Sequence, residues 1–355
     1  MARTCTTSFL YLVLVLLPQM LWLHHSNHGL VVCEACGSVM EAALNNRAKA
    51  PPPSHVSDQC TSELPCSDDA AYQELSEEES DYTRMNDTHY PSLCSCSVAG
   101  AEGKVSDVYS DAPNGGWSSP GGYPDLSGPC TIRRVEASSL TQRDFEWRFA
   151  YTEPVIITGL PGQSDFRAGC SKYRLLKEFG HDIITVATAN THSYRKEKVS
   201  LCDYVETMMA AQTLTTLGNE TLYYFGDNNR EDWSSLFSLY TLPPYHVPDT
   251  TPVLSFGLAG PGSGVPFHIH GPTFAETVYG RKRWFLYPPP HSPHFDPDQT
   301  TLHWLKHTYP QLVAMDTERP LECTLQPGEV IYFPDKWWHA TLNLDTAVFM
   351  STFYS

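Results

Sequence analysis

A series of short β-strand patterns, separated by Gly, Pro and Asp turns, fills the chain beyond Pro252 and restricts the possible folds more than any other feature. Many short strands with such turns are typical of a β-sandwich or a closed barrel. A helical pattern at Thr301–His307 interrupts them. The expected strands are Val253–Phe256, Phe267–Ile269, Phe274–Tyr279, Arg283–Tyr287, Leu321–Leu325, Glu329–Phe333, Ala340–Leu344 and Ala347–Phe353.

The segment between Cys130 and Pro252 mixes strand and helix patterns. Pro154–Gly159 and Ile183–Thr188 predict strands, the first of them closed by a glycine. Apolar residues at helical spacing predict helices at Ser171–Phe179, Leu201–Met209 and Glu231–Tyr240. We therefore expect residues 131–355 to form a mostly β domain with flanking helices.

The first residues have the pattern of a secretory signal peptide. A single positive charge at Arg3 precedes an apolar run from Phe9 to Leu17. That run is shorter than the roughly 20 apolar residues of a membrane-spanning helix, and Pro18 breaks it. Residues 1–23 are thus predicted to be a signal peptide with cleavage between residues 24 and 36, and an uncleaved anchor is the alternative.

Residues 24–128 differ in composition from the rest of the chain. Residues 1–128 contain 16 acidic side chains against 5 basic ones, with Pro51–Pro53 and Glu77–Glu79 as biased runs. Apolar residues show no sustained period in this part. The expected state is an acidic, cysteine-containing, largely disordered segment.

The composition of the whole chain excludes two classes of protein. Hydrophobic residues make up 41% of the sequence, which is too many for a wholly disordered chain. The formal net charge is −17, from 23 basic and 40 acidic residues. Because Lys and Arg supply most of the affinity for phosphate, nucleic acid is not an expected partner.

Cysteines and glycosylation sequons agree with entry into the secretory pathway. The chain has 11 cysteines, and ten remain if Cys5 leaves with the signal peptide, although the spacing does not reveal which of them pair. Asn86 and Asn219 each begin an Asn-x-Thr sequon. The predicted location is the endoplasmic reticulum lumen, with secretion as the alternative, and no stable membrane span is expected.

Three histidines have the spacing of a metal site in a β-barrel. His268 and His270 alternate with Ile269 on a predicted strand, so their imidazoles point to the same face. His339 follows Trp338 at a later strand that could lie beside the first. Imidazole suits iron, zinc, copper and nickel, so the three residues alone do not select a metal.

The blocks around these histidines resemble the jumonji-C (JmjC) branch of the cupin superfamily. The blocks are Phe267–Pro272, Tyr279–Pro289 and Pro327–His339, in the order and spacing of that family. The resemblance covers about residues 131–355. It implies a double-stranded β-helix (jelly-roll or cupin barrel) that binds Fe(II) and 2-oxoglutarate.

The same resemblance assigns roles to individual residues. His268 and His339 match two metal ligands, but His270 occupies the position of the Asp or Glu in active relatives. Lys282 matches the basic residue that pairs with 2-oxoglutarate, and Thr273 lies near a polar co-substrate contact. Exchanging a carboxylate for neutral imidazole removes one negative charge from the ligand set.

Glu276 is a candidate fourth ligand that would restore this charge. Glu276 and Lys282 share strand parity, so we expect both to face the barrel interior if either does. The alternative is that Glu276 forms an ion pair with Arg281 or Arg283.

Three functions therefore remain open. The first is a catalytically weak or silent module that regulates or binds secretory-pathway proteins. The second is an Fe(II)/2-oxoglutarate-dependent hydroxylase of a protein substrate, and the third is a three-histidine cupin that uses another metal. The fold does not decide among these functions, and the sequence leaves homo-oligomers open.

Overall fold

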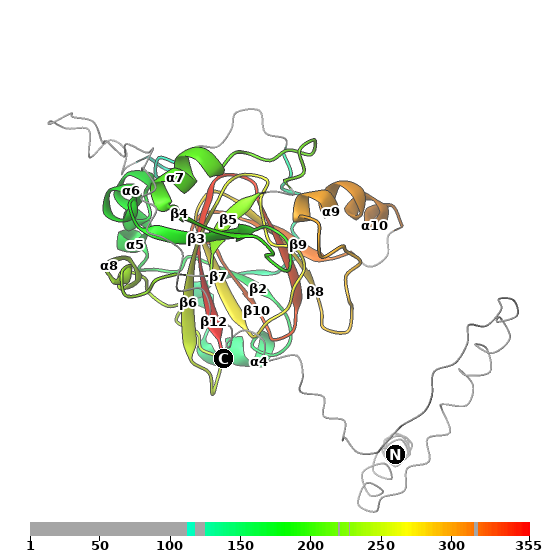
Figure 1. Ribbon diagram of the computed structural model, residues 1–355. Helices are drawn as coiled ribbons and strands as arrows, with labels where there is room; N and C mark the ends of the chain where they lie inside the picture. Colours follow the sequence, from blue (N-terminus) through cyan, green and yellow to red (C-terminus); the bar gives the residue numbers. More distant parts are fainter. Residues whose placement is uncertain (1–111, 118–124, 219–220, 227, 316–318) are drawn as a thin grey trace, which may run out of the picture. The chain divides into compact units, whose positions relative to one another are not determined.

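A computed structural model describes residues 112–117, 125–218, 221–226, 228–315 and 319–355, which build a β-barrel with helices outside it (Figure 1). The predicted signal peptide, both sequon asparagines and most of the acidic segment lie outside these residues. The strands are β1 (Arg134–Glu136), β2 (Val155–Thr158), β3 (Ile183–Thr188), β4 (Lys196–Ser200), β5 (Leu222–Phe225), β6 (Pro252–Ala259), β7 (Thr273–Tyr279), β8 (Lys282–Tyr287), β9 (Leu321–Leu325), β10 (Val330–Phe333), β11 (Trp338–Asn343) and β12 (Ala347–Tyr354).

The strands form two sheets that face each other. The large sheet has the order β1-β2-β10-β7-β12-β6-β5-β3-β4, and the small sheet has the order β11-β8-β9. Alternate residues of each strand point inward, so Ala275 and Ile331 of the large sheet pack against Trp284 and Leu286 of the small sheet. This arrangement confirms the predicted double-stranded β-helix.

The segment that precedes β7 extends the small sheet beside β11. The amide of Thr341 donates to the carbonyl of Val265 at 2.8 Å, and the amide of Asn343 donates to that of Ser263 at 2.8 Å. His268 and His339 form an isolated antiparallel bridge at the end of this pairing. The predicted strand at Phe267–Ile269 is therefore a single bridge, because the chain turns away after His268.

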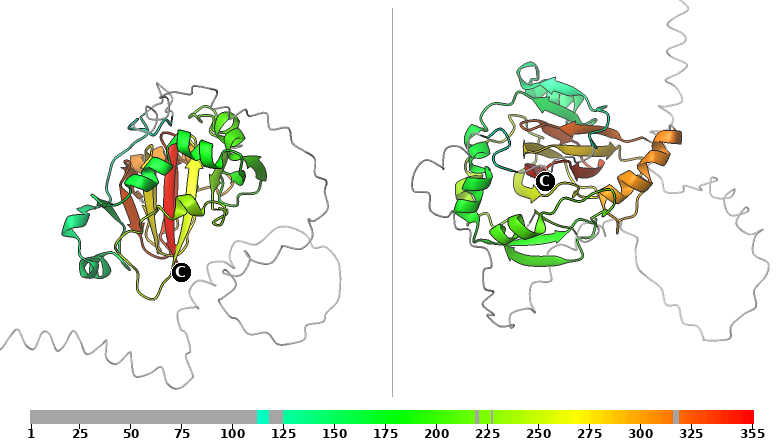
Figure 2. Two further views of the ribbon diagram at one scale, coloured as in Figure 1. Left: turned by 90° about the vertical axis from the view of Figure 1, so that its left-hand side faces the viewer. Right: turned by 90° about the horizontal axis from the view of Figure 1, so that it is seen from above.

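Helices cover the outer faces of both sheets (Figures 1 and 2). Phe145 of α4 packs on one end of the large sheet, and Phe166 of α5 packs on the other. Trp304 of α9 covers the small sheet. The helices are α4 (Gln142–Arg148), α5 (Ser164–Gly169), α6 (Lys172–Phe179), α7 (Leu201–Asp203), α8 (Ser234–Phe237), α9 (Thr301–His307) and α10 (Tyr309–Met315), with a 3₁₀ turn η2 (Ala137–Ser139) and a π-helical turn η3 (Tyr204–Met208). Within the described ranges, every helix is too short or too polar to cross a bilayer.

Two of the predicted helices differ from the structure. Glu231–Tyr240 contains only the single turn α8, because Trp233 and Tyr240 are buried from the turns on either side of it. Leu201–Met209 divides into α7 and the π-helical turn η3, which buries Tyr204. Helix propensity alone cannot predict where tertiary packing replaces a regular helix with turns.

The packed structure begins before the predicted boundary at residue 128. Trp117 is 3% exposed, and its indole N–H donates to the carbonyl of Cys170 at 3.0 Å. The carbonyl of Ser127 accepts from Thr324 Oγ1 at 2.7 Å. Parts of the acidic segment thus belong to the domain.

A disulfide joins Cys130 to Cys323, which are 193 residues apart in sequence. It ties the chain just before β1 to β9 of the small sheet. Cross-linking a loop of this length removes conformational freedom chiefly from the unfolded chain. Cys170 is a buried free thiol.

We predict that Trp117→Ala lowers the free energy of unfolding by about 3–5 kcal/mol, because it empties a buried indole site and removes its hydrogen bond. Urea denaturation of the purified protein measures the effect. Trp147→Ala is the matched control: Trp147 is 81% exposed, and its loss should stay within about 0.5 kcal/mol. If Trp117→Ala lowered the free energy of unfolding as little as Trp147→Ala, the indole of Trp117 would contribute no packing energy.

Candidate metal centre

The structure brings His268, His270 and His339 together inside one mouth of the barrel. Their ring centroids are 4.1 Å apart for His268 and His339, 4.4 Å for His270 and His339, and 5.4 Å for His268 and His270. One candidate ligand nitrogen from each residue lies within 4.8 Å of the others. Among the described residues this is the one group of three or more potential ligands that could hold a metal ion.

Backbone carbonyls hold all three imidazoles in the same tautomer. Nδ1 of His268 lies 2.8 Å from the carbonyl oxygen of Pro266, Nδ1 of His270 lies 2.9 Å from that of Gly271, and Nδ1 of His339 lies 2.9 Å from that of Trp337. A carbonyl oxygen can only accept a hydrogen bond, so each Nδ1 carries the hydrogen and each Nε2 keeps a free lone pair. Such hydrogen bonds are typical of the outer shell of a metal site.

Burial keeps these imidazoles neutral. Burial, together with the neighbouring His270, lowers the pKa of His268 to about 4. Burial also lowers the pKa of His270 and, with the two other histidines, that of His339. Neutral imidazole is the form that binds metal.

Aromatic rings enclose the three histidines. The ring of Phe333 lies 4.4 Å from that of His339, and the ring of Phe353 lies 4.8 Å from that of His270. The indole of Trp284 lies 6.1 Å from His339, and its buried N–H has no hydrogen-bond partner within the described protein. This shell limits water access and leaves one donor free for a bound ligand.

Lys282 lies on the same inner face as His339. Lys282 of β8 is paired with Asn343 of β11. Side chains alternate along a strand, so Asn343 and His339 point to the same face of β11, and Lys282 points to that face too. Lys282 Nζ donates to Asn343 Oδ1 at 2.9 Å and lies 3.9 Å from the ring centroid of Phe349. Burial lowers the pKa of Lys282 to about 7.

Thr273 supports His270 directly. Its hydroxyl lies 3.2 Å from Nδ1 of His270 and donates to the carbonyl of Gly271 at 3.1 Å. In this structure the side chain predicted to contact a co-substrate therefore helps to orient a histidine.

Glu276 does not lie with the three histidines, contrary to the parity argument. Its neighbours across the large sheet are Val330 and Met350, which belong to the outer packing layers. The inward and outward alternation of side chains along β7 does not continue into β8, because the chain turns at Gly280, where φ is +74°. The predicted alternative also fails, because Arg281 pairs with Asp345 and Arg283 with Glu322.

Asn343 is a site residue that the sequence argument missed. It holds Lys282 on one side and donates to Ser263 Oγ at 3.2 Å on the other. The sequence did contain a signal for this role, because Asn343 lies two strand repeats beyond His339 and therefore on the same face of the strand. The histidines at positions 291, 294, 303 and 307 are not members of the cluster.

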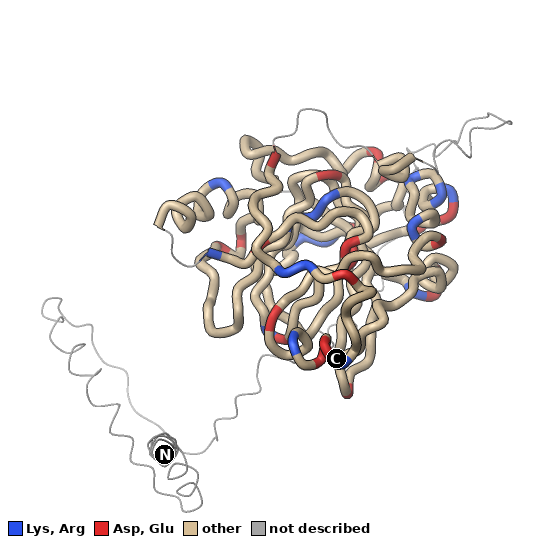
Figure 3. Tube along the Cα trace, turned by 180° about the vertical axis from the view of Figure 1, so that it is seen from behind, with Lys and Arg blue, Asp and Glu red and all other residues tan. Residues whose placement is uncertain are grey.

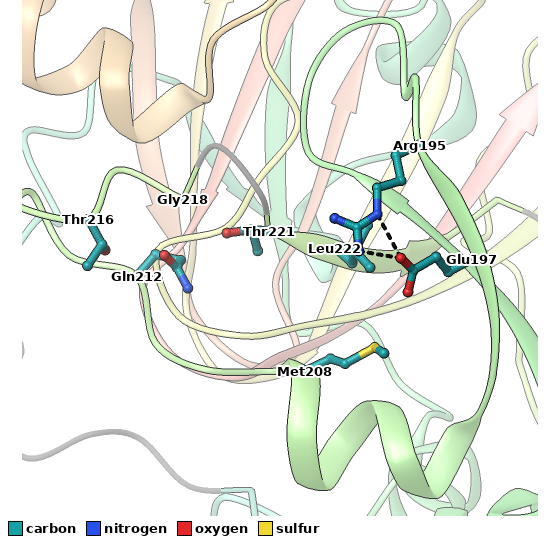
Figure 4. Close-up of a pocket in the computed structure, with 8 residues that line it drawn as sticks. All are labelled: Arg195, Glu197, Met208, Gln212, Thr216, Gly218, Thr221 and Leu222. Carbon is teal, nitrogen blue, oxygen red and sulfur yellow. Dashed lines mark hydrogen bonds and ion pairs between the residues drawn. The ribbon is translucent and has the colours of Figure 1, made fainter.

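A separate pocket of about 390 Å³ lies beside β4 and β5 (Figure 4). An ion pair between Arg195 and Glu197 forms part of its wall. None of the predicted site residues lines it, so it is distinct from the histidine cluster. Its lining residues are Arg195, Glu197, Met208, Gln212, Thr216, Gly218, Thr221 and Leu222.

Comparison with known proteins finds one family. The cupin-like domain matches residues 270–355. The chain is 53% identical to human JmjC domain-containing protein 8 over 242 residues, which cover 68% of this chain and 90% of the human protein. The mouse protein of the same name is 54% identical over 224 residues, which cover 63% of this chain and 82% of the mouse protein.

A solved structure of the ribosomal oxygenase YcfD from Escherichia coli, in complex with cobalt and 2-oxoglutarate, also matches. The match has 16% identity and a TM-score of 0.36, and it covers 61% of this chain and 52% of that one.

We predict that the His339→Ala variant contains no bound metal when it is purified in the same way as the unsubstituted protein. The loss of affinity should exceed the roughly 10–100-fold that removal of an outer-shell partner costs. Inductively coupled plasma mass spectrometry gives the metal content per chain. His303→Ala, a substitution outside the cluster, should keep the metal, and equal metal in both variants would contradict the site.

Proposed function

The chain belongs to the JmjC domain-containing protein 8 family of cupin-like proteins, and on that premise we propose that it is a metal-binding regulatory module of the secretory pathway with weak or no oxygenase activity. The observation that carries this proposal is the set of three neutral imidazoles with their Nδ1 atoms hydrogen-bonded to carbonyls. Such an ordered donor set fits a divalent ion of iron, zinc, copper or nickel.

The absence of a carboxylate from the cluster supports weak oxygenase activity. His270 stands where active JmjC relatives carry Asp or Glu, and Glu276 lies on the other face of the sheet. A divalent ion bound here would keep its full charge against three neutral ligands and act as a Lewis acid. In relatives that use Fe(II) with 2-oxoglutarate, a carboxylate ligand offsets one of the two positive charges of the metal, and three neutral imidazoles offset none.

Lys282 supports the second candidate, an Fe(II)/2-oxoglutarate-dependent protein hydroxylase. Its buried ammonium faces the neutral amide of Asn343. A dicarboxylate that reached both the metal and Lys282 would supply the negative charge that this inner face lacks. The residues fit 2-oxoglutarate, which would supply electrons for oxygen activation when bound with iron.

Several features support a lumenal location. The first residues have the signal-peptide pattern, and Cys130 is disulfide-bonded to Cys323, a linkage typical of oxidising compartments. Lys and Arg are interspersed with Asp and Glu along the described chain (Figure 3), so a protein partner or substrate fits better than nucleic acid. Homo-oligomers are compatible with this role.

We predict that the native protein turns over no 2-oxoglutarate and that His270→Asp raises its affinity for Fe(II) and starts slow succinate formation. The new carboxylate restores one negative charge beside the metal. Elemental analysis, calorimetric titration with 2-oxoglutarate and succinate detection measure these three properties. His307→Asp controls for an added acid elsewhere. Rapid succinate formation by the native protein would instead establish the hydroxylase.

We predict that the mature protein is lumenal and carries N-linked glycans at Asn86 and Asn219. Protease added to intact microsomes should leave it uncut, and endoglycosidase should increase its gel mobility. Digestion in sealed vesicles would place the protein on the cytosolic side.

A further inference from the structure

A second buried polar cluster lies on the outer face of the large sheet. Glu276 of β7 is 4% exposed, Thr352 of β12 is 0% exposed, and Tyr240, which follows α8, is 8% exposed. The hydroxyl of Tyr240 faces both Glu276 and Thr352. Glu276 Oε2, Tyr240 Oη and Thr352 Oγ1 all lack a direct hydrogen bond of normal geometry within the described protein.

These three oxygens meet where a helical layer packs on the sheet. Glu276 and Thr352 come from the central strands β7 and β12, whereas Tyr240 packs edge-on against Phe166 of α5 with ring centroids 4.9 Å apart. The helices α5, α6 and α8 lie along this side of the barrel (Figures 1 and 2). The cluster therefore links two layers of the fold.

A negative charge at Glu276 would have little direct compensation. The described residues include no ion pair of Glu276, and the guanidinium of Arg167 donates instead to the carbonyls of Pro113 and Val278. Burial raises the pKa of Glu276 to about 7, although Tyr240 and Arg167 act in the opposite direction. The titratable and charged groups that face this region are Arg167 and Cys170 from α5 and its end, Arg174 of α6, Tyr240, Tyr279 of β7 and Tyr354 of β12.

We propose that Glu276, Tyr240 and Thr352 form a pH-sensitive latch, which holds the α5–α6–α8 layer on the sheet while Glu276 keeps its proton and loosens when that proton leaves. The hydroxyl of Tyr240 favours the ionised carboxylate, but burial of that charge without a paired cation disfavours it more strongly. An ionised, under-solvated carboxylate at this position favours local opening to water.

The direction of the pH effect follows from the two protonation states. In the opened state Glu276 is solvated and titrates near its ordinary pKa of 4.5, whereas in the closed state it titrates near 7. The closed state therefore binds more protons between these values, so the latch is strongest below pH 4.5 and weakens as the pH rises to 7. Above pH 7 both states are ionised and the effect levels off.

Cys170 provides a local probe of this opening. It is a free, fully buried thiol at the end of α5, close enough to Glu276 for their charges to interact. Full-length protein with intact disulfides is treated with N-ethylmaleimide, and mass spectrometry quantifies the Cys170 peptide. Rates are divided by those of a solvated thiol at each pH. The normalised rate should rise roughly 40-fold between pH 5 and pH 7 if one proton controls opening.

Glu276→Gln should abolish this rise, because the amide does not titrate. Glu329→Gln is the matched control, since the Glu329 side chain pairs with Arg134 and takes no part in the Glu276 cluster, and it should keep the wild-type profile. A rise of the same size in Glu276→Gln would overturn the proposal.

Tyr240→Phe keeps the test decisive if Glu276→Gln does not fold. Tyr240 lowers the pKa of Glu276, so its loss should move the pH profile to higher pH. An unmoved profile would overturn the latch. Neither result depends on a bound metal, so the latch and the metal centre can fail separately.

Discussion

The backbone pairing of His268 with His339 is the interaction on which the site depends. The amide of each residue donates to the carbonyl of the other, at 3.1 Å and 3.0 Å. The pairing adds an edge to the small sheet and brings ligands from distant parts of the sequence within reach of one another. Gly264 permits this approach, because a Cβ at that position would overlap the carbonyl of Thr341. A glycine that supplies no ligand thus helps to build the centre.

The inner face of the barrel has an unusual balance of charge. The described inner residues contribute three neutral imidazoles and one lysine, while Glu276 faces outward. A divalent ion would add to the positive charge of a protonated Lys282, and the nearby rings of Phe333, Phe353 and Trp284 lower the local polarity around the cluster. The site is therefore suited to hold an anion together with its metal. The lack of a carboxylate in the described cluster makes this preference stronger.

The local pattern in the sequence predicted the features that depend on strand alternation. The barrel strands follow from a period of two, which short strands keep faithfully. The predicted convergence of His268 with His270 is also present, although only His268 lies in a bridge. The same rule failed at Glu276 because the turn at Gly280 separates β7 from β8. Pairing of Cys130 with Cys323 could not be predicted, since cysteine spacing carries no connectivity. The sequence around Trp117 has no periodic pattern of apolar residues, so only the tertiary packing shows that this side chain is buried.

The pleat of β7 serves both polar sites. Thr273 points inward and holds His270, whereas Glu276, three residues along the same strand, points outward to Tyr240. A strand in the middle of a sheet is held by hydrogen bonds on both edges, here by β10 and β12. Such a strand resists bending, so loosening of the helical layer need not displace the histidines. The fold can therefore respond to protonation on one face of the sheet while it keeps a fixed ligand geometry on the other.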